Sequence, residues 1–435
     1  MAAPFRLTGR LRPTKEAGYY RELPVQVDTP STRRIESLDM SDPLDVARYI
    51  FMNDESELRS GWRVLAFFFF FILSASLLTG LIKLFATLFP SLSFLEREPS
   101  DSEVLTSSKL IYFFVTNLIN LAAAIIASAI CARVLERRSF GSVGFRRHRR
   151  WLRDYGLGSV MGAASLAIAV GIAATAKATT FDVQTRGAAQ LASGFLIVLV
   201  FFLVAGASEE LIFRGFPFQA LVHNLGGAAA VAITSVVFGL AHLANPSASA
   251  ISTINTMLAG IWLGLAYLMT RSLWLATALH YSWNVAMVFI FGLPVSGFTM
   301  LNQLAWLRGS EGVPVWISGG SYGPEGGVAA TAALILSTLA IWKSGMFAPS
   351  EEMLVAVRHG KPQPPFVSIA PESQEQLDPA DGPRKPEQTD NGEDQLLSET
   401  ANRGGPPVTR IQAGGPPKPS RSTLGLRRSS RQCRR

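Results

Sequence analysis

The chain has 435 residues, of which 48% are hydrophobic and 17% are charged, with a formal net charge of +8. The apolar residues are clustered in long blocks, which excludes a typical soluble domain and predicts an all-α polytopic membrane protein. The positive charge does not indicate nucleic-acid binding, because the basic residues lie in the tails and in one short loop, where topology signals are found. With only two cysteines, Cys131 and Cys433, no disulfide framework is expected.

Residues 1–60 are expected to form a cytoplasmic N-terminal region, with residues 1–40 disordered because they are polar, basic and rich in turn residues. This polar start also predicts that no cleavable signal peptide opens the chain. Ser41-Asp42-Pro43 combines a capping side chain with a proline suited to a first helical turn. It predicts an interfacial helix over residues 43–58, with a loosely ordered linker as the alternative.

Eight apolar segments follow, and we expect them to form an eight-helix transmembrane domain over residues 61–346. The segments lie at residues 62–88, 109–133, 155–177, 194–222, 226–244, 251–270, 273–293 and 324–346.

The loops between these segments predict the topology. The loop at 89–108 is acidic, whereas the loop at 134–154 carries many arginines. By the positive-inside rule the basic loop is cytoplasmic and the acidic loop lies outside, and alternation then places both termini in the cytoplasm. The long loop at 294–323 falls on the outer side and is a candidate cap. Residues 347–435 are rich in Pro, Gly and charged residues without an apolar period, which predicts a disordered cytoplasmic tail.

The stretch Ala205–Arg214, AGASEELIFR, places charged residues inside an apolar run. Its adjacent carboxylates are Glu209 and Glu210, and Arg214 follows four residues after the second. Interpreted as one helix, residues 194–222 would span about 43 Å at ~1.5 Å per residue and hold the carboxylates near mid-depth. A carboxylate there costs at least ~2.5 kcal/mol, which favours a functional site.

Two of the five histidines, His242 and His280, also lie inside apolar segments. Counting ~1.5 Å per residue from the helical turns places Glu209 and His242 about 20 Å from the turn between their segments. His280 and Asn284 share one helix face, because they are four residues apart, and lie about 11 and 16 Å from the preceding turn. Helix packing alone does not need this set, since Ser, Thr or Asn would serve at a lower desolvation cost.

These residue types fit hydrolysis of an amide without a covalent intermediate. A carboxylate beside an imidazole can activate a water as a general base. A second imidazole with a carboxamide can donate hydrogen bonds to a developing oxyanion. Glu210 and Arg214 can pair on one helix and offset each other's burial, so we expect supporting roles for them and leave Glu209 to act on the water. No HExxH helix is present.

Three motifs carry a family resemblance. They are EELIFR at Glu209–Arg214, FGLAH at Phe238–His242 and HYSWN at His280–Asn284, and they fit EExxxR, FxxxH and HxxxN. In this order, in consecutive membrane helices, they resemble the CAAX protease and bacteriocin-processing (CPBP) family of intramembrane endopeptidases, which includes type II CAAX prenyl proteases. The resemblance covers roughly residues 150–293, with a motif core at 194–293.

The resemblance implies an eight-helix fold whose polar cavity opens to the cytosol and to lipid. It implies that Glu209 and His242 act on the catalytic water and that His280 and Asn284 form the oxyanion hole. Two histidines and a glutamate could in principle hold zinc. The motif set contains no other strong ligand, so we expect no metal and no cofactor. The expected substrate is a membrane-associated or lipidated peptide or protein, prenylated or not, and the expected location is a bacterial plasma membrane.

Other functions stay open at this point. Intramembrane Glu, His and Arg residues also serve proton-coupled transporters, and some relatives act as immunity partners for secreted peptides. The polar membrane residues are concentrated in one part of the chain, without the matching half that inverted repeats would give. A third alternative is a scaffold with active tails and an inactive core, and the intact motif set counts against it.

Overall fold

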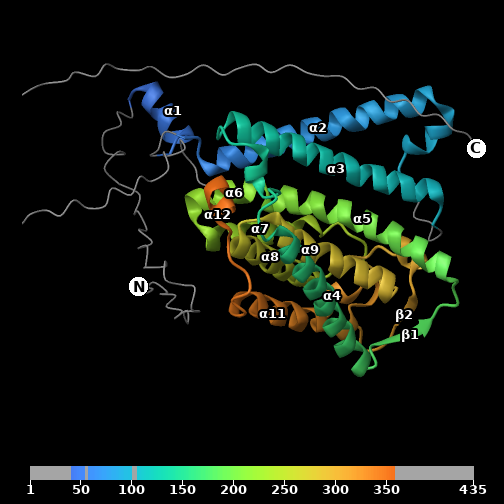
Figure 1. Ribbon diagram of the computed structural model, residues 1–435. Coiled ribbons are helices and arrows are strands. Elements are labelled where there is room, and N and C mark those ends of the chain that lie inside the picture. Colours follow the sequence, from blue (N-terminus) through green and yellow to red (C-terminus); the bar gives the residue numbers. More distant parts are fainter. Residues whose placement is uncertain (1–40, 54–56, 100–104, 358–435) are drawn as a thin grey trace, which may run out of the picture. The chain divides into compact units, whose positions relative to one another are not determined.

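The computed structural model describes residues 41–53, 57–99 and 105–357, so the predicted disorder of residues 1–40 and 358–435 lies outside the described residues (Figure 1). The described chain is a helical bundle with one small antiparallel sheet. Its helices and strands are, in order, α1 (Pro43–Phe51), α2 (Ser60–Leu88), α3 (Ser107–Val134), α4 (Trp151–Thr175), β1 (Thr179–Val183), α5 (Ala188–Arg214), α6 (Phe216–Leu225), α7 (Gly227–Ala241), α8 (Ala250–Thr270), α9 (Leu273–Val285), β2 (Leu307–Glu311), α10 (Val315–Ser318), α11 (Val328–Lys343) and α12 (Glu351–Val357).

Each of the eight predicted apolar segments contains a helix, which confirms an all-α polytopic membrane protein. Within the described residues, six helical stretches are long and apolar enough to cross a membrane: α2, α3, α4, α5 with α6, α8, and α9 with the π-helical turn η4 (Ala286–Ile290). The other two, α7 and α11, have 15 and 16 residues. At ~1.5 Å per residue they reach about 22 to 24 Å, less than the roughly 30 Å of a hydrocarbon core.

The helix predicted for residues 43–58 begins where the sequence predicts and ends earlier. The Asp42 carboxylate caps α1 by accepting a hydrogen bond from the Leu44 backbone N–H at 2.9 Å, and Pro43 is the first helical residue. The helix ends at Phe51 rather than residue 58, because the chain turns back on itself there and Met52 bridges to Leu58. Leu44 is 70% exposed, as an apolar residue facing a membrane surface would be.

The expectation of one continuous helix over residues 194–222 is wrong. The structure ends α5 at Arg214 and starts α6 at Phe216. Pro217 causes the break, because it has no N–H for a hydrogen bond to the carbonyl four residues earlier and its ring would clash there. Glu209 therefore lies one and a half turns from the end of α5, and a depth calculated along a straight helix does not apply to it.

The helices pack so that the motif-bearing elements lie together in the middle. Helix α4 packs on α9, α7 on α8, and α5 on both α3 and α9, while α11 covers α4 and α8 (Figure 1). Gly260 permits the close approach of α7 and α8, since a Cβ there would lie 2.7 Å from the Ser235 Cα. Helices α2 and α3 pair on the side of α5, and much of α2 presents exposed apolar side chains of the kind that face lipid.

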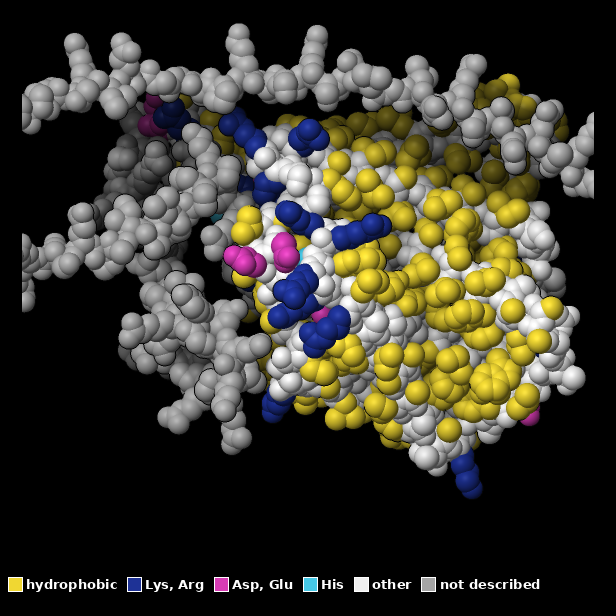
Figure 2. Space-filling model, viewed as in Figure 1, with side chains coloured by type: hydrophobic (Ala, Val, Ile, Leu, Met, Phe, Trp, Pro, Cys, Tyr) yellow, Lys and Arg dark blue, Asp and Glu magenta, His cyan; other side chains and the backbone are white. Residues whose placement is uncertain are grey.

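The end of the bundle that carries the basic loop is filled. A buried cluster there contains Phe67 of α2, Leu211 of α5, Phe216 and Phe218 of α6 and Tyr267 of α8. In Figure 2, Lys and Arg side chains gather at this end beside α6 and α12, and hydrophobic side chains cover much of the rest of the face.

The opposite end of the bundle carries the long loop between α9 and α11, the candidate cap. Strand β1, which follows α4, pairs antiparallel with β2 inside this loop, with Thr179 opposite Glu311. The loop also closes on itself, because the Gly297 N–H donates to the Tyr322 carbonyl at 2.9 Å. These strands were not expected from the sequence, and they tie the loop to the bundle.

The first residues of the expected tail differ from the prediction. Residues 347–357 are described, and they include α12. Phe347 and Met353 are buried, and the Arg153 side chain donates to the Met346 carbonyl at 3.1 Å. Phe347 packs in the core of the bundle, and α12 contacts the 3₁₀ turn Phe140–Val143 of the basic loop.

Candidate active site

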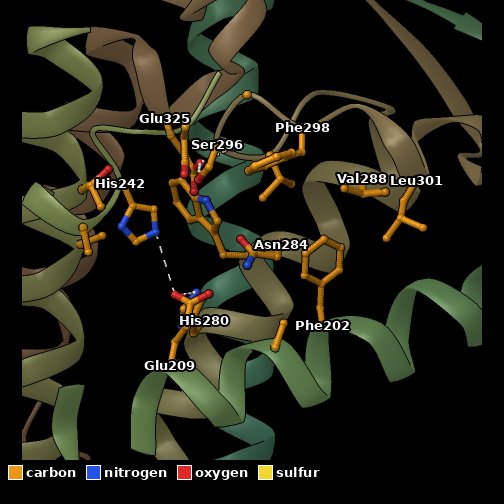
Figure 3. Close-up of a pocket in the computed structure, with 18 of the residues that line it drawn as sticks. Phe202, Glu209, His242, His280, Asn284, Val288, Ser296, Phe298, Leu301 and Glu325 are labelled. Atoms are coloured by element: carbon orange, nitrogen blue, oxygen red, sulfur yellow. Dashed lines mark hydrogen bonds and ion pairs between the residues drawn. The ribbon is translucent and has the colours of Figure 1, made fainter. Parts of the chain in front are cut away.

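A cavity of about 710 Å³ opens among α5, α7, α8, α9 and the α9–α11 loop. Glu209, His242, His280 and Asn284 all line it, so the structure brings together the four residues that the motifs single out (Figure 3). The space exists because α7 is short. It ends at Ala241, His242 caps its C-terminus, and the chain turns away before α8 begins at Ala250.

Glu209 and Glu210 point in different directions, since neighbouring helical residues are about 100° apart. The Glu209 side chain is 33% exposed and reaches the cavity, whereas Glu210 is fully buried. Glu210 Oε1 accepts hydrogen bonds from Arg214 Nη1 at 3.1 Å and from His280 Nδ1 at 2.8 Å. The expected Glu210–Arg214 ion pair is present, and His280 joins it as a third member.

The Arg214 guanidinium is held from two further sides. It lies 4.3 Å from the centre of the Phe238 ring, a cation–π contact, and its Nη2 donates to the Gly260 carbonyl at 3.4 Å. These contacts link α5, α7 and α8 behind Glu209. The buried charges of Glu210 and Arg214 thus form a fixed support for the cavity wall.

The His280 ring orientation follows from its partner. A carboxylate only accepts, so Nδ1–H donates to Glu210, and Nε2 faces Glu209 Oε2 at 3.8 Å. Because Nδ1 carries a proton, Nε2 can donate a hydrogen bond only when the ring holds both protons. The carboxylates of Glu209 and Glu210 lie on either side of the ring.

His242 is oriented by the backbone. Its Nδ1 lies 2.7 Å from the Phe238 carbonyl oxygen, which can only accept, so Nδ1 carries the proton. In the neutral ring Nε2 then has a free lone pair, and it faces Glu209 Oε2 at 4.0 Å. That separation is too long for a direct hydrogen bond. Glu209 Oε2 has no hydrogen-bond partner among the described residues.

Asn284 lies one turn beyond His280 on α9 and is 7% exposed. Its carboxamide therefore lines the cavity on the same face as the His280 ring. In Figure 3, Asn284 projects into the space between His280 and the aromatic side chains Phe202 and Phe298.

Sequence reasoning missed three contributors to the site. The motif FGLAH includes Phe238, but its role in orienting His242 is not predicted. The four-residue spacing is the signal for it, because it brings the Phe238 carbonyl within reach of the His242 ring. Glu325 and Ser296 also line the cavity. An isolated acidic residue at the start of an apolar segment was the available signal for Glu325, and nothing in the sequence pointed to Ser296.

The cavity extends toward one end of the bundle. Its lining includes Glu98 and Lys109, next to the start of α3, and residues of the α9–α11 loop. These residues lie at the end of the bundle opposite the basic loop. At the end with the basic loop, the buried cluster around Phe216 fills the interior. The cavity and the basic loop therefore lie toward opposite ends of the bundle.

Within the described residues, no group of three or more His, Cys, Asp and Glu side chains is arranged to hold a metal ion. Two imidazoles and the Glu209 carboxylate are nevertheless donors of the type that zinc accepts.

Comparison with known proteins gives one finding. Residues 191–286 match the family model described as type II CAAX prenyl endopeptidase Rce1-like. No curated protein and no solved structure matches the chain. The matched segment runs from early α5 to the start of η4 and so contains all three motifs and the four cavity residues they supply. Residues 191–286 are therefore similar to the type II CAAX prenyl endopeptidases, which supports a CAAX protease family assignment for this segment of an integral membrane protein.

Proposed function

We propose that the chain is a glutamate-type intramembrane endopeptidase that hydrolyses a peptide bond of a membrane-associated or lipidated substrate. The observation that carries the proposal is the position of Glu209 Oε2, which lies 4.0 Å from His242 Nε2 and 3.8 Å from His280 Nε2 without a direct hydrogen bond. One water bridges polar atoms at such a separation. Three groups therefore lie around the position of such a water. They are the Glu209 carboxylate, which can accept a proton, the lone pair of His242 Nε2, and His280 Nε2, which donates when the ring holds both protons.

The reaction begins with that water. Its oxygen attacks the scissile carbonyl carbon while its proton passes to the Glu209 carboxylate or to His242 Nε2. His242 can accept because its own proton is on Nδ1, bound to the Phe238 carbonyl. The C–N bond then breaks, and the proton taken from the water passes to the leaving amine. Atoms and charge balance without a covalent intermediate.

The carbonyl oxygen becomes negative during the attack. The Asn284 carboxamide N–H and the doubly protonated His280 Nε2–H are the donors that can stabilise it. Glu210 holds His280 through Nδ1 and is itself fixed by Arg214, so this donor does not need to reorganise during the reaction. The roles of Glu210 and Arg214 are to position and to balance charge.

The cavity wall also bears on the substrate. Phe202, Val288, Phe298 and Leu301 form an apolar side of the cavity beside the polar residues (Figure 3). An apolar peptide segment or a lipid chain can lie against them. We propose that the protein works in a bacterial plasma membrane with both termini in the cytoplasm, on the support of the basic loop 134–154 and the acidic loop 89–108.

The test compares purified wild type with Glu209→Gln in proteoliposomes. The substrates are quenched-fluorescence peptides, one set carrying a farnesylated cysteine near a free C-terminus and one set of unmodified transmembrane sequences. Glu311→Gln is the matched control, because it removes a carboxylate from the exposed face of β2, away from the cavity. Cleavage by wild type and the control, lost in Glu209→Gln at an unchanged melting temperature, supports the proposal.

A strong chelator separates the mechanisms. Cleavage that survives the chelator supports a water activated by Glu209 and His242 alone. Cleavage that the chelator removes and zinc restores would replace that mechanism with a metal site. Undiminished cleavage by Glu209→Gln would contradict the proposal as a whole.

A further inference from the structure

Glu325 lines the same cavity as Glu209 and has no part in the proposed hydrolysis. Glu325 stands in the 3₁₀ turn η7 (Pro324–Gly326), just before α11, and lines the cavity with Glu209 and Asn284. Figure 3 shows Glu325 with Ser296 at one end of the view and Glu209 with His280 at the other.

The protein fixes the position of Glu325 but does not neutralise it. Glu325 Oε2 accepts hydrogen bonds from the Ser296 backbone N–H at 2.9 Å and from the Ser296 hydroxyl at 2.6 Å. The backbone around it is also held, because the Asn255 carboxamide donates to the carbonyls of Glu325 and Gly327 at 2.9 and 2.8 Å. No Lys or Arg of the described residues pairs with this carboxylate.

The Glu325 carboxylate acts electrostatically on the neighbouring Tyr322 and on the cavity. Burial, and after it the Glu325 carboxylate, raises the pKa of the Tyr322 hydroxyl. The cavity lining as a whole is acidic, because Glu98, Glu209 and Glu325 line it against one lysine, Lys109. Such a lining attracts positive charge and repels a free carboxylate.

Helix α8 gives a scale for the separation between the Glu325 backbone and the ion pair behind Glu209. Asn255 on α8 contacts the Glu325 backbone, and Gly260 on α8 contacts Arg214, behind Glu209 and Glu210. Five residues of helix separate these contacts, or about 7.5 Å at ~1.5 Å per residue. An extended peptide advances about 3.3 Å or slightly more per residue, so a substrate that crosses this cavity meets Glu325 within a few residues of the scissile bond.

We propose that Glu325 is a specificity residue that binds a cationic side chain of the substrate, a Lys or Arg within about three residues of the cleaved bond. The inference rests on the proposed function. It also predicts that a substrate whose cleaved piece ends nearby in a free C-terminal carboxylate is disfavoured, because that carboxylate would meet Glu325 at the same distance.

Glu325 also has a structural contact that the test must separate from recognition. Ser296 has a positive φ of 47°, and its hydrogen bonds to Glu325 help to hold this turn. Glu325→Gln is suited to the separation, because the Gln carbonyl oxygen can accept both hydrogen bonds from Ser296 while the negative charge is lost.

The experiment measures binding in the Glu209→Gln background, so it does not depend on turnover. The probes are fluorescein-labelled transmembrane peptides made in matched pairs, called twins. The two peptides of a pair differ only at one of the three positions on either side of a central bond, where one has Lys and the other has Met. At one position at least, the Lys twin should bind about tenfold tighter than the Met twin, as expected for a charge-assisted hydrogen bond. In Glu209→Gln/Glu325→Gln the twins should bind within about twofold of each other.

A third variant tests the role of the charge by reversing it. Glu209→Gln/Glu325→Lys should prefer a Glu twin over the Lys twin at the same position. Equal binding of the Lys and Met twins at every position overturns the proposal, as does a preference that survives Glu325→Gln, or the absence of saturable binding by any twin. Failure of the proposed function shows differently, as cleavage that does not depend on Glu209.

Discussion

Charged side chains are held differently in two regions of the bundle, the ion-pair cluster around Arg63 at the filled end and the cavity around Glu209. At the filled end, Arg63 is 1% exposed and donates to Glu57 at 2.5 Å and to Glu136 at 3.1 Å, and Arg138 also donates to Glu136. In the cavity, Glu209 Oε2 has no hydrogen-bond partner among the described residues. Removing one member of a buried ion pair is strongly destabilising, so the charges around Arg63 serve the fold, whereas a charge left open to a cavity can act on a ligand.

The same contrast exists within the motif EELIFR. Glu210 is fully buried and accepts hydrogen bonds from Arg214 and His280, so its charge is balanced within the protein. Glu209, one residue away, reaches the cavity. Two adjacent and identical side chains therefore divide support and chemistry between them, and the helical rotation of about 100° per residue is the cause.

The largest expected effect concerns access to the cavity from the end opposite the basic loop. Phe298 lines the cavity and is 52% exposed. In a background with Cys131→Ala and Cys433→Ser, a bulky membrane-impermeant maleimide on Phe298→Cys should abolish cleavage. The reagent should react from the outer face of right-side-out vesicles, with activity and gel shift as the measurements.

Arg149→Cys is the matched control for access, since Arg149 lies exposed in the basic loop. Its labelling should need inside-out vesicles and leave cleavage unchanged. Full activity of labelled Phe298→Cys, or inhibition through position 149, would show that substrates enter from the filled end.

The next effect concerns Asn284. Replacing it by Ala removes one donor from the developing oxyanion and should lower kcat by about 10² to 10³-fold with little change in KM. Ser282→Ala is the control on the same helix, because the Ser282 hydroxyl donates to the Leu279 carbonyl and does not line the cavity. An Asn284→Ala variant that raises KM and keeps kcat would assign the carboxamide to substrate binding.

A change at the filled end should affect stability instead of chemistry. Arg63→Met leaves Glu57 and Glu136 without their shared partner and should cost about 3 kcal/mol of unfolding free energy. The exposed pair Arg48–Asp45 is the control, since Arg48→Met should cost less than about 1 kcal/mol. Denaturation in detergent micelles measures both. Cleavage per folded molecule should stay that of wild type, and a selective loss of kcat would contradict the division between the two ends.

How far the sequence predicts the molecule depends on the distance over which each feature is encoded. Apolar length locates all eight helix segments, and four-residue spacing places His280 with Asn284 and Glu210 with Arg214, because helical contacts are local. Pro217 is likewise a local signal, for the break between α5 and α6, although the predicted helix over residues 194–222 did not take it into account. Glu325 and Ser296 are 29 residues apart in the sequence, and the paired residues of β1 and β2 are further apart still. No local sequence pattern therefore predicts either contact.

The smallest expected effect is a pH dependence of stability from the basic loop, at the filled end. His148 is 3% exposed, and burial lowers the pKa of its imidazole, with Glu352 opposing the shift and Arg150 adding to it. The unfolded chain therefore takes up a proton before the folded chain does, near the ordinary histidine pKa of about 6.5. Stability should be fully present above that pH and fall as the pH drops toward the lowered pKa of the folded state.

Two variants test this pH dependence through the melting temperature between pH 7.5 and about 5.5, the interval that spans the ordinary histidine pKa. His148→Gln should flatten the decline at low pH, because the titrating group is gone. Glu352→Gln should steepen it, since Glu352 is the carboxylate that favours protonated His148. The Glu352 carboxyl has a lowered pKa of its own, through hydrogen bonds to its backbone and to Ser350, so it stays ionised over this interval. Equal slopes for wild type and His148→Gln would assign the acid sensitivity to groups elsewhere in the chain.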